Sequence, residues 1–329
     1  MRSVIDSPNF KAGAFRNLSE TSVMAEDASY RKMFWDFFNK PADSSPAEPL
    51  PSIKTNLQNL NSSSPLIIWF GHSSYLIHCN GLNILVDPVF DRSASPLPFL
   101  VKAFAGTNIY ETNDLPPIHY LVITHNHYDH LNKSTIKAMA PALKKVIAPL
   151  GLFRQLNKWG IDKAAITELD WWEDHKLEDH VRISATPARH FSGRGIKRGG
   201  SLWNSYWLSL FGKSIYIGGD SGYDTHFRAI RERYGDADLS ILECGQYNTA
   251  WPHIHMMPEE VVQAHLDLGA KALLPVHWGK FALAYHGWKE PVNRVTEAAN
   301  KEGILITTPM IGEPLIIDNI YPSERWWEI

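Results

Sequence analysis

The chain has 329 residues, with 32 Lys and Arg against 35 Asp and Glu, so its formal net charge is −3. This length is enough for one large domain or two small ones with a substantial core. Hydrophobic residues make up 44% of the chain and charged residues 20%, which is typical of a globular protein and argues against disorder. The near-neutral balance gives no support to nucleic-acid binding through bulk charge. Two cysteines, Cys79 and Cys244, are too few for a disulfide framework or a thiolate zinc cluster.

The sequence contains no apolar run of the roughly 18 residues that a bilayer-spanning helix needs. Residues 1–20 are polar and are interrupted by Pro8 and Gly13, so they lack the apolar centre of a secretory signal. We therefore expect a soluble, cytoplasmic chain.

Residues 1–60 are expected to form an N-terminal extension and residues 61–329 the main domain. Up to Tyr30 the chain is predicted to be poorly ordered or to drape over that domain. A short helix with an aromatic side is expected next, packed on or near the domain, because apolar residues recur there at helical spacing: Met33, Phe34, Phe37 and Phe38. Residues 41–51 are rich in Pro and Ser and have the composition of a linker.

From Leu66 onward, short β-rich runs come first, and strands then mix with helices. The sequence predicts strands at 66–70, 74–78, 83–86, 120–124, 145–148, 181–186, 201–209, 214–217, 239–243 and 272–275. Helices are predicted at 134–140, 152–158, 225–234, 258–268 and 291–301. The turn signal Asn80-Gly81 predicts a hairpin over residues 74–86. This order favours two packed sheets covered by helices over a doubly wound parallel sheet.

A compact group of possible metal ligands follows the apolar run 120–124. The chain reads His125-Asn126-His127-Tyr128-Asp129-His130 at this point, with four candidate donors in six positions. Alternate residues at a strand end point the same way, so His125 and His127 can face one ion. Asp129 and His130 lie one turn further on and can serve a second ion. Imidazole and carboxylate donors fit zinc, manganese or iron. A polar loop with surface histidines is the alternative.

Six residues cannot fill two coordination spheres, so further donors are expected from other strand ends. His190 follows the strand 181–186, Asp220 follows 214–217, and His277 follows 272–275. Each one alone is more typical of a turn or a cap, but all three lie after the carboxyl end of a strand. Small residues surround Asp220 in Gly218-Gly219-Asp220-Ser221-Gly222 and allow a close backbone approach.

These motifs resemble the metallo-β-lactamase superfamily, whose fold is a four-layer αβ/βα sandwich. Within it, the chain is similar to N-acylphosphatidylethanolamine-hydrolysing phospholipase D and its bacterial relatives. The likeness runs from about Leu66 to about Pro291. Besides the loop 125–130, it rests on segments 69–74, 87–90, 93–96, 187–190, 219–223 and 277–284.

The resemblance implies a dinuclear metal centre. One ion takes His125, His127 and His190, the other takes Asp129, His130 and His277, and Asp220 bridges the two. Zinc is the expected metal, with manganese or iron as alternatives. Two divalent cations about 3.5–4 Å apart can activate a shared hydroxide and neutralise charge on a phosphoryl or carbonyl oxygen. Asp129 is expected to be essential for turnover.

Two further residues are candidates for supporting roles. Asp87 ends the strand 83–86 and is either an acceptor for a ligand histidine or a turn residue before Pro88. The subgroup has a histidine matching His255 that faces the substrate, which implies a role in leaving-group or phosphate handling. The alternative is a histidine near a helix start. The remaining histidines, His72 among them, are expected to be surface or core residues.

The resemblance implies phospholipase D type cleavage of N-acylphosphatidylethanolamine to phosphatidic acid and an N-acylethanolamine. Residues 95–104 and the run 33–38 are apolar and either touch lipid at a peripheral membrane contact or pack against the sheets. One alternative on the same centre is a lactonase or a sugar-phosphodiester hydrolase. Others are a di-iron redox module and a non-enzymatic metal-binding or lipid-binding protein.

Overall fold

A computed structural model describes residues 3–97, 99–195 and 197–329 of the chain. Pro98, within the apolar segment 95–104, lies outside the described residues, as does the side chain of Phe37. The strands are β1 (Phe10–Lys11), β2 (Ala14–Phe15), β3 (Leu66–Trp69), β4 (Tyr75–Cys79), β5 (Leu82–Val86), β6 (Tyr120–Val122), β7 (Val146–Pro149), β8 (Ile166–Leu169), β9 (Asp174–Glu178), β10 (Val181–Pro187), β11 (Asn204–Leu210), β12 (Lys213–Ile217), β13 (Leu239–Glu243), β14 (Ala272–Val276), β15 (Leu305–Ile306) and β16 (Pro314–Ile316). The α-helices are α1 (Tyr30–Phe38), α2 (Lys133–Met139), α3 (Phe153–Lys158), α4 (His226–Tyr234), α5 (Pro258–Asp267) and α6 (Glu290–Lys301).

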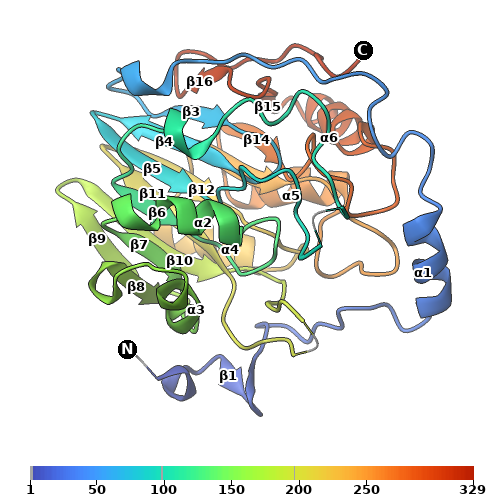
Figure 1. The fold of residues 1–329 in the computed structure, drawn as a ribbon, viewed down its shortest axis with the longest axis horizontal. Coiled ribbons are helices and arrows are strands. Elements are labelled where there is room, and N and C mark those ends of the chain that lie inside the picture. The colour runs from blue at the N-terminus through green and yellow to red at the C-terminus, as the bar shows by residue number, and fades with distance from the viewer. Residues whose placement is uncertain (1–2, 98, 196) are drawn as a thin grey trace.

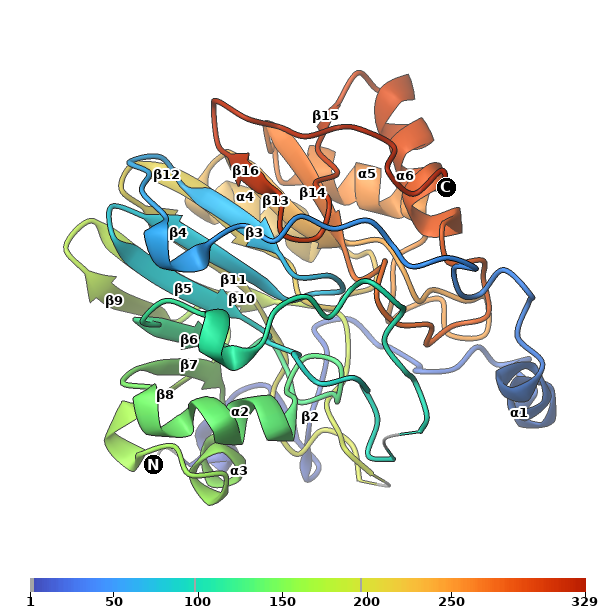
Figure 2. The same ribbon diagram turned by 45° about the horizontal axis from the view of Figure 1, so that its top comes forward.

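Two seven-stranded sheets pack together at the centre of the molecule, and helices cover their outer faces (Figures 1 and 2). The strand order is β16-β3-β4-β5-β6-β7-β8 in the first sheet and β15-β14-β13-β12-β11-β10-β9 in the second. Helices α2 and α3 cover the first sheet, and α4, α5 and α6 cover the second. The prediction of two packed sheets covered by helices is confirmed.

Each sheet is antiparallel in one half and parallel in the other. In the first sheet β5, β6, β7 and β8 run parallel, and in the second β12, β13, β14 and β15 do so. Strand β10 runs in the same direction as β12 because both pair antiparallel with β11. Since parallel strands end at the same edge, the loops that follow these strands gather along one edge of each sheet.

Strand β3 shows how the sequence builds two cores from one strand. All four of its residues are buried. Ile67 and Trp69 join the core between the sheets, whereas Leu66 and Ile68 join a second core with Ile136 of α2. Successive side chains of a strand point to opposite faces, so a strand buried on both faces must be apolar throughout.

The sequence analysis missed several strands and misplaced some boundaries. Strand β9 reads Asp174-His175-Lys176-Leu177-Glu178 and lies at the edge of its sheet, where only Leu177 is buried. Such a polar edge strand carries no clear alternation of apolar residues. Strands β8, β15 and β16 were also not predicted, and β6 ends at Val122 rather than at residue 124. Strand β11 begins at Asn204 rather than at residue 201.

The N-terminal segment is draped over the domain. Strands β1 and β2 form a small hairpin, and the Phe15 amide donates to the Gly199 carbonyl at 2.9 Å. The predicted aromatic helix is confirmed as α1, which lies at one side of the molecule (Figure 1). The Tyr285 hydroxyl donates to the Met33 carbonyl at 3.0 Å and links this helix to the domain. Among the described residues, no helix combines the length and apolar character needed to cross a bilayer.

Four tryptophans tie the C-terminal tail to the sheets. Trp278 follows β14, and its ring centre lies 5.4 Å from that of Trp69 and 5.2 Å from that of Trp326. Trp327 is fully buried, and its Nε1 donates to Asn293 Oδ1 at 2.7 Å. The tail is therefore part of the core.

We expect Trp327→Ala to lower the free energy of unfolding by about 3–5 kcal/mol, because a large buried ring is lost and a cavity is left. Chemical denaturation followed by circular dichroism measures the change. Trp35→Ala is the matched control, because Trp35 is 67% exposed and its loss should change stability by less than about 0.5 kcal/mol. Equal effects of the two substitutions would contradict a structural role for the tail.

Candidate metal centre

The structure brings together all the metal ligands that the sequence predicts. The loops after β6, β10, β12 and β14 supply them, and each of these strands ends toward the same region. The side chains fall into two groups that share a carboxylate: His125, His127 and His190 in one, Asp129, His130 and His277 in the other, and Asp220 between them.

The first group surrounds a single point. The Nδ1 atom of His127 lies 2.9 Å from His125 Nε2 and 3.1 Å from His190 Nε2. Asp220 Oδ2 lies 3.6 Å from His125 Nε2 and 3.7 Å from His190 Nε2. Ligands at 2.0–2.1 Å from a tetrahedral zinc ion are separated from one another by about 3.3 Å. The observed separations bracket that value, so these four residues fit one divalent cation.

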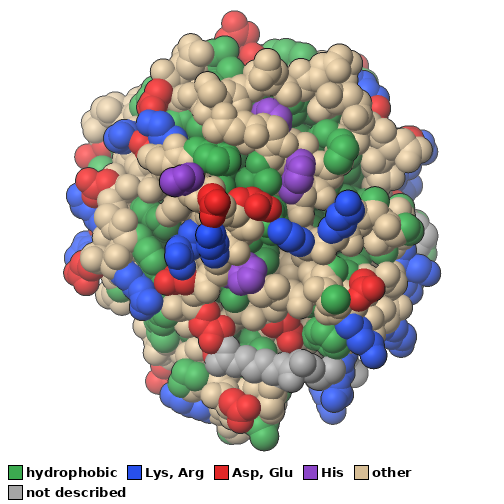
Figure 3. Space-filling model, turned by 90° about the vertical axis from the view of Figure 1, so that its left-hand side faces the viewer, with side chains coloured by type: hydrophobic (Ala, Val, Ile, Leu, Met, Phe, Trp, Pro, Cys, Tyr) green, Lys and Arg blue, Asp and Glu red, His purple; other side chains and the backbone are tan. Residues whose placement is uncertain are grey.

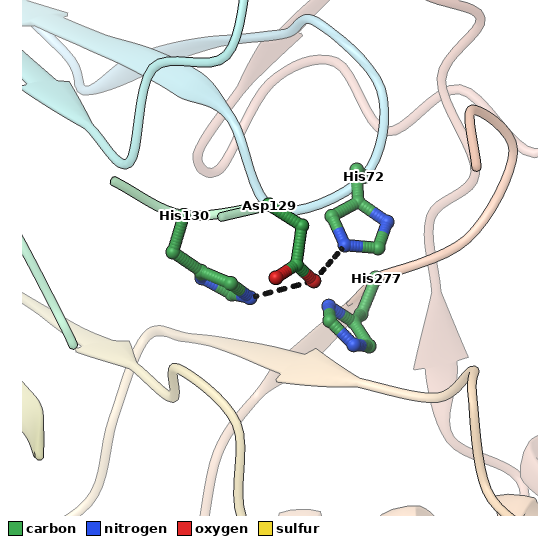
Figure 4. Close-up of side chains that lie close together, drawn as sticks. All are labelled: His72, Asp129, His130 and His277. Carbon is green, nitrogen blue, oxygen red and sulfur yellow. Dashed lines mark hydrogen bonds and ion pairs between the residues drawn. The ribbon is translucent and has the colours of Figure 1, made fainter. Parts of the chain in front are cut away.

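The second group contains a residue that the sequence analysis did not predict (Figure 4). His72 Nε2 donates to Asp129 Oδ2 at 2.8 Å, and the His72 ring lies 4.1 Å from the His277 ring. His130 Nε2 lies 3.6 Å from the same Asp129 oxygen. His72 is buried, as expected of a core residue, but its contact with Asp129 was not predicted.

Asp220 lies between the two groups and offers one oxygen to each. Its Oδ2 atom faces the first group, whereas Oδ1 lies 3.0 Å from His130 Nε2 and 3.2 Å from His277 Nδ1. The Oδ1 atom and His130 Nε2 are both buried and lack a well-oriented hydrogen bond. Buried polar atoms without partners are rare in folded proteins. A divalent cation held by the second group would satisfy both of them.

Burial sets the charge state of most of these histidines. It holds the pKa of His125, His190 and His277 well below the ordinary value and lowers the pKa of His127 to about 3. These rings are therefore neutral at pH 7 and keep the lone pairs that a metal needs. Burial also lowers the pKa of His130, but the Asp220 and Asp129 carboxylates outweigh it and raise that pKa well above normal. A cation can take over the positive charge that this ring otherwise carries.

Asp87 orients His130 from behind. Its Oδ2 atom accepts from His130 Nδ1 at 2.7 Å, and its Oδ1 atom accepts from the Thr124 amide at 2.8 Å. The hydrogen bond that the sequence analysis considered is present, and Asp87 also has a left-handed backbone with φ of 40°. A carboxylate behind a histidine fixes its tautomer and turns Nε2 toward the centre.

His255 lies at the rim of the centre, close to both groups. Its ring is 5.1 Å from that of His190 and 5.3 Å from that of His277. Its Nδ1 atom is hydrogen-bonded to Glu243 Oε2 at 2.8 Å, and Glu243 Oε1 accepts from the Ser221 amide at 2.9 Å. His255 is the more exposed partner, because its side chain is 12% exposed and that of Glu243 is fully buried.

The backbone around Asp220 is crowded, which explains its glycines. A Cβ atom on Gly222 would lie 2.0 Å from the His253 carbonyl oxygen. Gly219 has φ of 61°, and a Cβ atom there would lie 3.0 Å from Thr124. The close approach predicted for this segment is therefore present.

Sequence reasoning missed His72 and Glu243. Glu243 is the last residue of β13, the one parallel strand of the second sheet between β12 and β14, so the strand-end rule used for the other residues also selects it. His72 precedes β4 and depends on a turn with φ of 56°. The His72 amide donates to the Trp278 carbonyl and the His277 amide donates to the His72 carbonyl, both at 3.0 Å. No local sequence signal predicts that pairing.

Comparison with known proteins agrees with this architecture. Residues 82–278 match the family model described as a Beta-lactamase superfamily domain. The chain belongs to the metallo-β-lactamase superfamily. It is a metal-dependent hydrolase of that superfamily, with histidine and aspartate clusters able to hold metal.

Among its relatives, an uncharacterized protein of Mycobacterium tuberculosis is 37% identical over 328 residues, which cover 98% of this chain and 88% of the relative. A Caenorhabditis elegans protein named N-acyl-phosphatidylethanolamine-hydrolyzing phospholipase D 1 is 29% identical over 265 residues, covering 74% of this chain and 73% of that protein. Among solved structures, the metallo hydrolase Igni18 from Ignicoccus hospitalis has a TM-score of 0.60 at 19% identity, covering 77% of this chain and 97% of that one. This last likeness concerns the fold alone.

We expect Asp87→Asn to weaken metal binding about 10–100-fold, because an amide cannot accept from both Thr124 and His130 at the same oxygens. Titration of chelator-stripped protein with zinc against a competing indicator measures the affinity. Asp91→Asn is the control, since Asp91 is exposed and interacts with Ser134. Unchanged zinc affinity in Asp87→Asn would show that Asp87 is only a turn residue.

Proposed function

We propose that the chain is a dinuclear phosphodiesterase of the phospholipase D type that cleaves N-acylphosphatidylethanolamine. His125, His127 and His190 hold one divalent cation, and Asp129, His130 and His277 hold the other. Zinc is the proposed metal because the donors are imidazole and carboxylate groups, which also suit manganese and iron. One observation carries the proposal: the two oxygens of Asp220 face different groups.

When bound, paired cations supply a hydroxide at neutral pH and neutralise charge on the phosphoryl oxygens. The residues of the chain supply position and protons. Asp220 adds negative charge between the cations and lowers their mutual repulsion. Asp87 and His72 hold His130 and Asp129 in place through their hydrogen bonds.

His255 is the proposed acid for the leaving group. In the proposed step a hydroxide oxygen would attack phosphorus and the bond between phosphorus and the ethanolamine oxygen would break. That oxygen would take the Nε2 proton of His255 in its imidazolium form, which leaves a neutral ring whose Nδ1–H stays bonded to Glu243. Glu243 holds Nδ1 of the same ring, which leaves Nε2 for the substrate. The products are phosphatidic acid and an N-acylethanolamine.

Two observations support a phospholipid as the substrate. The Caenorhabditis elegans relative is named for this hydrolysis and matches 74% of the chain. In addition, large apolar side chains are exposed on α1 and at Leu97 and Phe99. A lactone or a sugar phosphodiester is the alternative substrate on the same centre.

We expect purified protein with bound metal to release N-acylethanolamine from N-acylphosphatidylethanolamine, and a chelator to abolish the release. Asp129→Asn should lower kcat by about 100-fold or more while the protein stays folded, because a proposed ligand of the second ion loses its charge. Liquid chromatography with mass spectrometry measures both products, and circular dichroism checks the fold.

Asp91→Asn serves again as the control and should keep the full rate. Full activity of Asp129→Asn would contradict the role of the second ion. Fast hydrolysis of lactones without phospholipid cleavage would overturn the proposed substrate and leave the metal centre intact.

The proposed contact with a bilayer lies on the side of the molecule that carries α1. Three large side chains of this helix point into solvent: Phe34 is 70% exposed, Trp35 67% and Phe38 66%. Leu97 and Phe99 are also exposed, and we call these five residues the apolar face. Exposed rings are favourable only where another apolar phase covers them.

The apolar face is connected to the metal centre through residues 281–285. Tyr285 binds the backbone of α1, and Leu283 packs against the cluster of Val89, Ala94 and Phe281 together with the segment that carries Leu97 and Phe99. The Phe281 ring lies 5.3 Å from the His72 ring. Residues 281–285 therefore link the neighbourhood of the centre to α1 and to the segment 95–104.

Positive side chains lie beside the apolar face together with acidic ones, because Asp36 pairs with Lys32 on α1 and Asp91 precedes the segment 92–110. Residues 92–110 contain Arg92 and Lys102 and no Asp or Glu. Arg31 adds an exposed positive charge on α1. Positive and negative side chains are also mixed on the opposite side of the molecule (Figure 3). Basic residues beside exposed rings are typical of interfacial helices.

We expect the triple variant Phe34→Ala, Trp35→Ala, Phe38→Ala to bind anionic phospholipid vesicles at least about tenfold more weakly, because each buried ring contributes about 1.5–3 kcal/mol. Vesicle sedimentation measures the binding. Hydrolysis of substrate in vesicles should fall in parallel, whereas hydrolysis of a monomeric short-chain substrate should not.

The matched control removes three exposed apolar side chains elsewhere, in Leu266→Ala, Leu305→Ala, Ile320→Ala. This variant should bind vesicles as the unmodified chain does. Equal losses in both triple variants would contradict a specific lipid-binding face.

A further inference from the structure

His190 is a proposed metal ligand in the long loop between β10 and β11, three residues after β10 ends. Strand β10 ends at Pro187 and β11 begins at Asn204, and the described residues between them form no helix or strand. His125, Asp220 and His277 likewise follow their strands by one to three residues. His190 lies beyond Pro187, the last residue of β10 that pairs with β11, so its backbone position depends on other contacts.

The N-terminal segment supplies those contacts through Asn17. The Asn17 side chain donates from Nδ2 to the His190 carbonyl at 2.9 Å and accepts at Oδ1 from the His190 amide at 3.1 Å. Trp203 Nε1 also donates to this Oδ1 atom, at 3.0 Å. Because an indole nitrogen can only donate, this contact fixes which end of the amide faces the His190 amide. Asn17 thus pairs with both backbone groups of His190 as a neighbouring strand would.

Further contacts fasten the same segment to the same loop. Thr21 Oγ1 accepts from Arg189 Nε at 3.0 Å, and the Glu20 carbonyl accepts from Arg189 Nη2 at 3.2 Å. Near the other end, a Cβ atom on Gly199 would lie 2.9 Å from the Ala14 side chain. We call residues 14–21 the strap.

The ring of His190 is held separately. Its Nδ1 atom donates to the Ile254 carbonyl at 2.9 Å, which leaves Nε2 facing His127. With the backbone paired to Asn17 and the ring fixed by Ile254, few rotations of this side chain remain free. Preorganisation of this kind strengthens metal binding, because the ordering of the ligand is completed during folding.

We propose that the strap is a positioning element of the metal centre and that Asn17 sets the affinity of the first ion through His190. The strap lies outside the family model match, which begins at residue 82. A residue from the N-terminal extension thus positions a ligand that lies inside the matched domain. This proposal concerns metal affinity and rests on the ligand role of His190, whichever substrate the chain cleaves.

We expect Asn17→Ala to weaken the binding of one of two zinc ions by about tenfold or more and to leave the other unchanged. Chelator-stripped full-length protein is titrated with zinc against a competing indicator, and bound zinc is counted by mass spectrometry. Substitution with cobalt gives an independent readout, because its absorption bands report the ligands of each ion. Thr21→Val, which removes the contact with Arg189 but none with His190, should weaken the same ion less.

Asn9→Ala is the matched control. Asn9 lies in the same N-terminal segment and donates from Nδ2 to Asp170 Oδ1 at 2.8 Å, away from the metal centre. The Asn9→Ala variant loses a similar hydrogen bond but should bind both zinc ions as tightly as the unmodified chain does. This should hold even if its melting temperature falls as much as that of Asn17→Ala. Equal zinc binding by Asn17→Ala and the unmodified chain would overturn the proposal. Equal loss of zinc in Asn17→Ala and Asn9→Ala would reduce the strap to a general stabiliser.

Discussion

The carboxylate of Asp220 is the constraint around which the centre is organised. It is buried, and burial raises its pKa, so an ionised Asp220 needs positive charge close by. Within the protein that charge is available from His130, whose pKa its acidic neighbours raise. The other histidines around Asp220 are neutral because burial disfavours their charged form. The carboxylates and the neutral imidazole nitrogens of the centre therefore outnumber the protons that are available to pair with them. This excess is what distinguishes a site for cations from a buried hydrogen-bond network.

The sheets allow such a site because their parallel halves end at common edges. Most of the ligands could be predicted for this reason: His125, His190, Asp220 and His277 each follow a recognisable apolar strand. The same rule also selects Glu243, which ends β13, but it was not applied to this strand. It could not work for His72, whose position depends on a left-handed turn and on backbone pairing with His277. Contacts between segments that lie two hundred residues apart leave no local pattern in the sequence.

The fold shows the same division between local and distant information. Apolar strands buried on both faces were predictable from composition alone, as β3 and β13 show. The edge strand β9 was not, because a strand with one buried side chain has the composition of a loop. The N-terminal segment was predicted to be either poorly ordered or draped, because a chain without apolar periodicity takes its structure from its contacts. Those contacts, between Asn17 and His190 and between Thr21 and Arg189, exist only in the folded molecule.

Separate roles for the domain and its extension follow from these contacts. The sheets hold the ligands through short connections to strands, so the centre itself tolerates little change. The N-terminal extension reaches the centre on two sides, through Asn17 at the His190 loop and through α1 beside residues 281–285. At the first of these places the extension bonds the backbone of His190, and at the second it carries exposed rings. An extension of this kind can change metal affinity and surface binding independently, because the two contacts share no residue and lie on different loops.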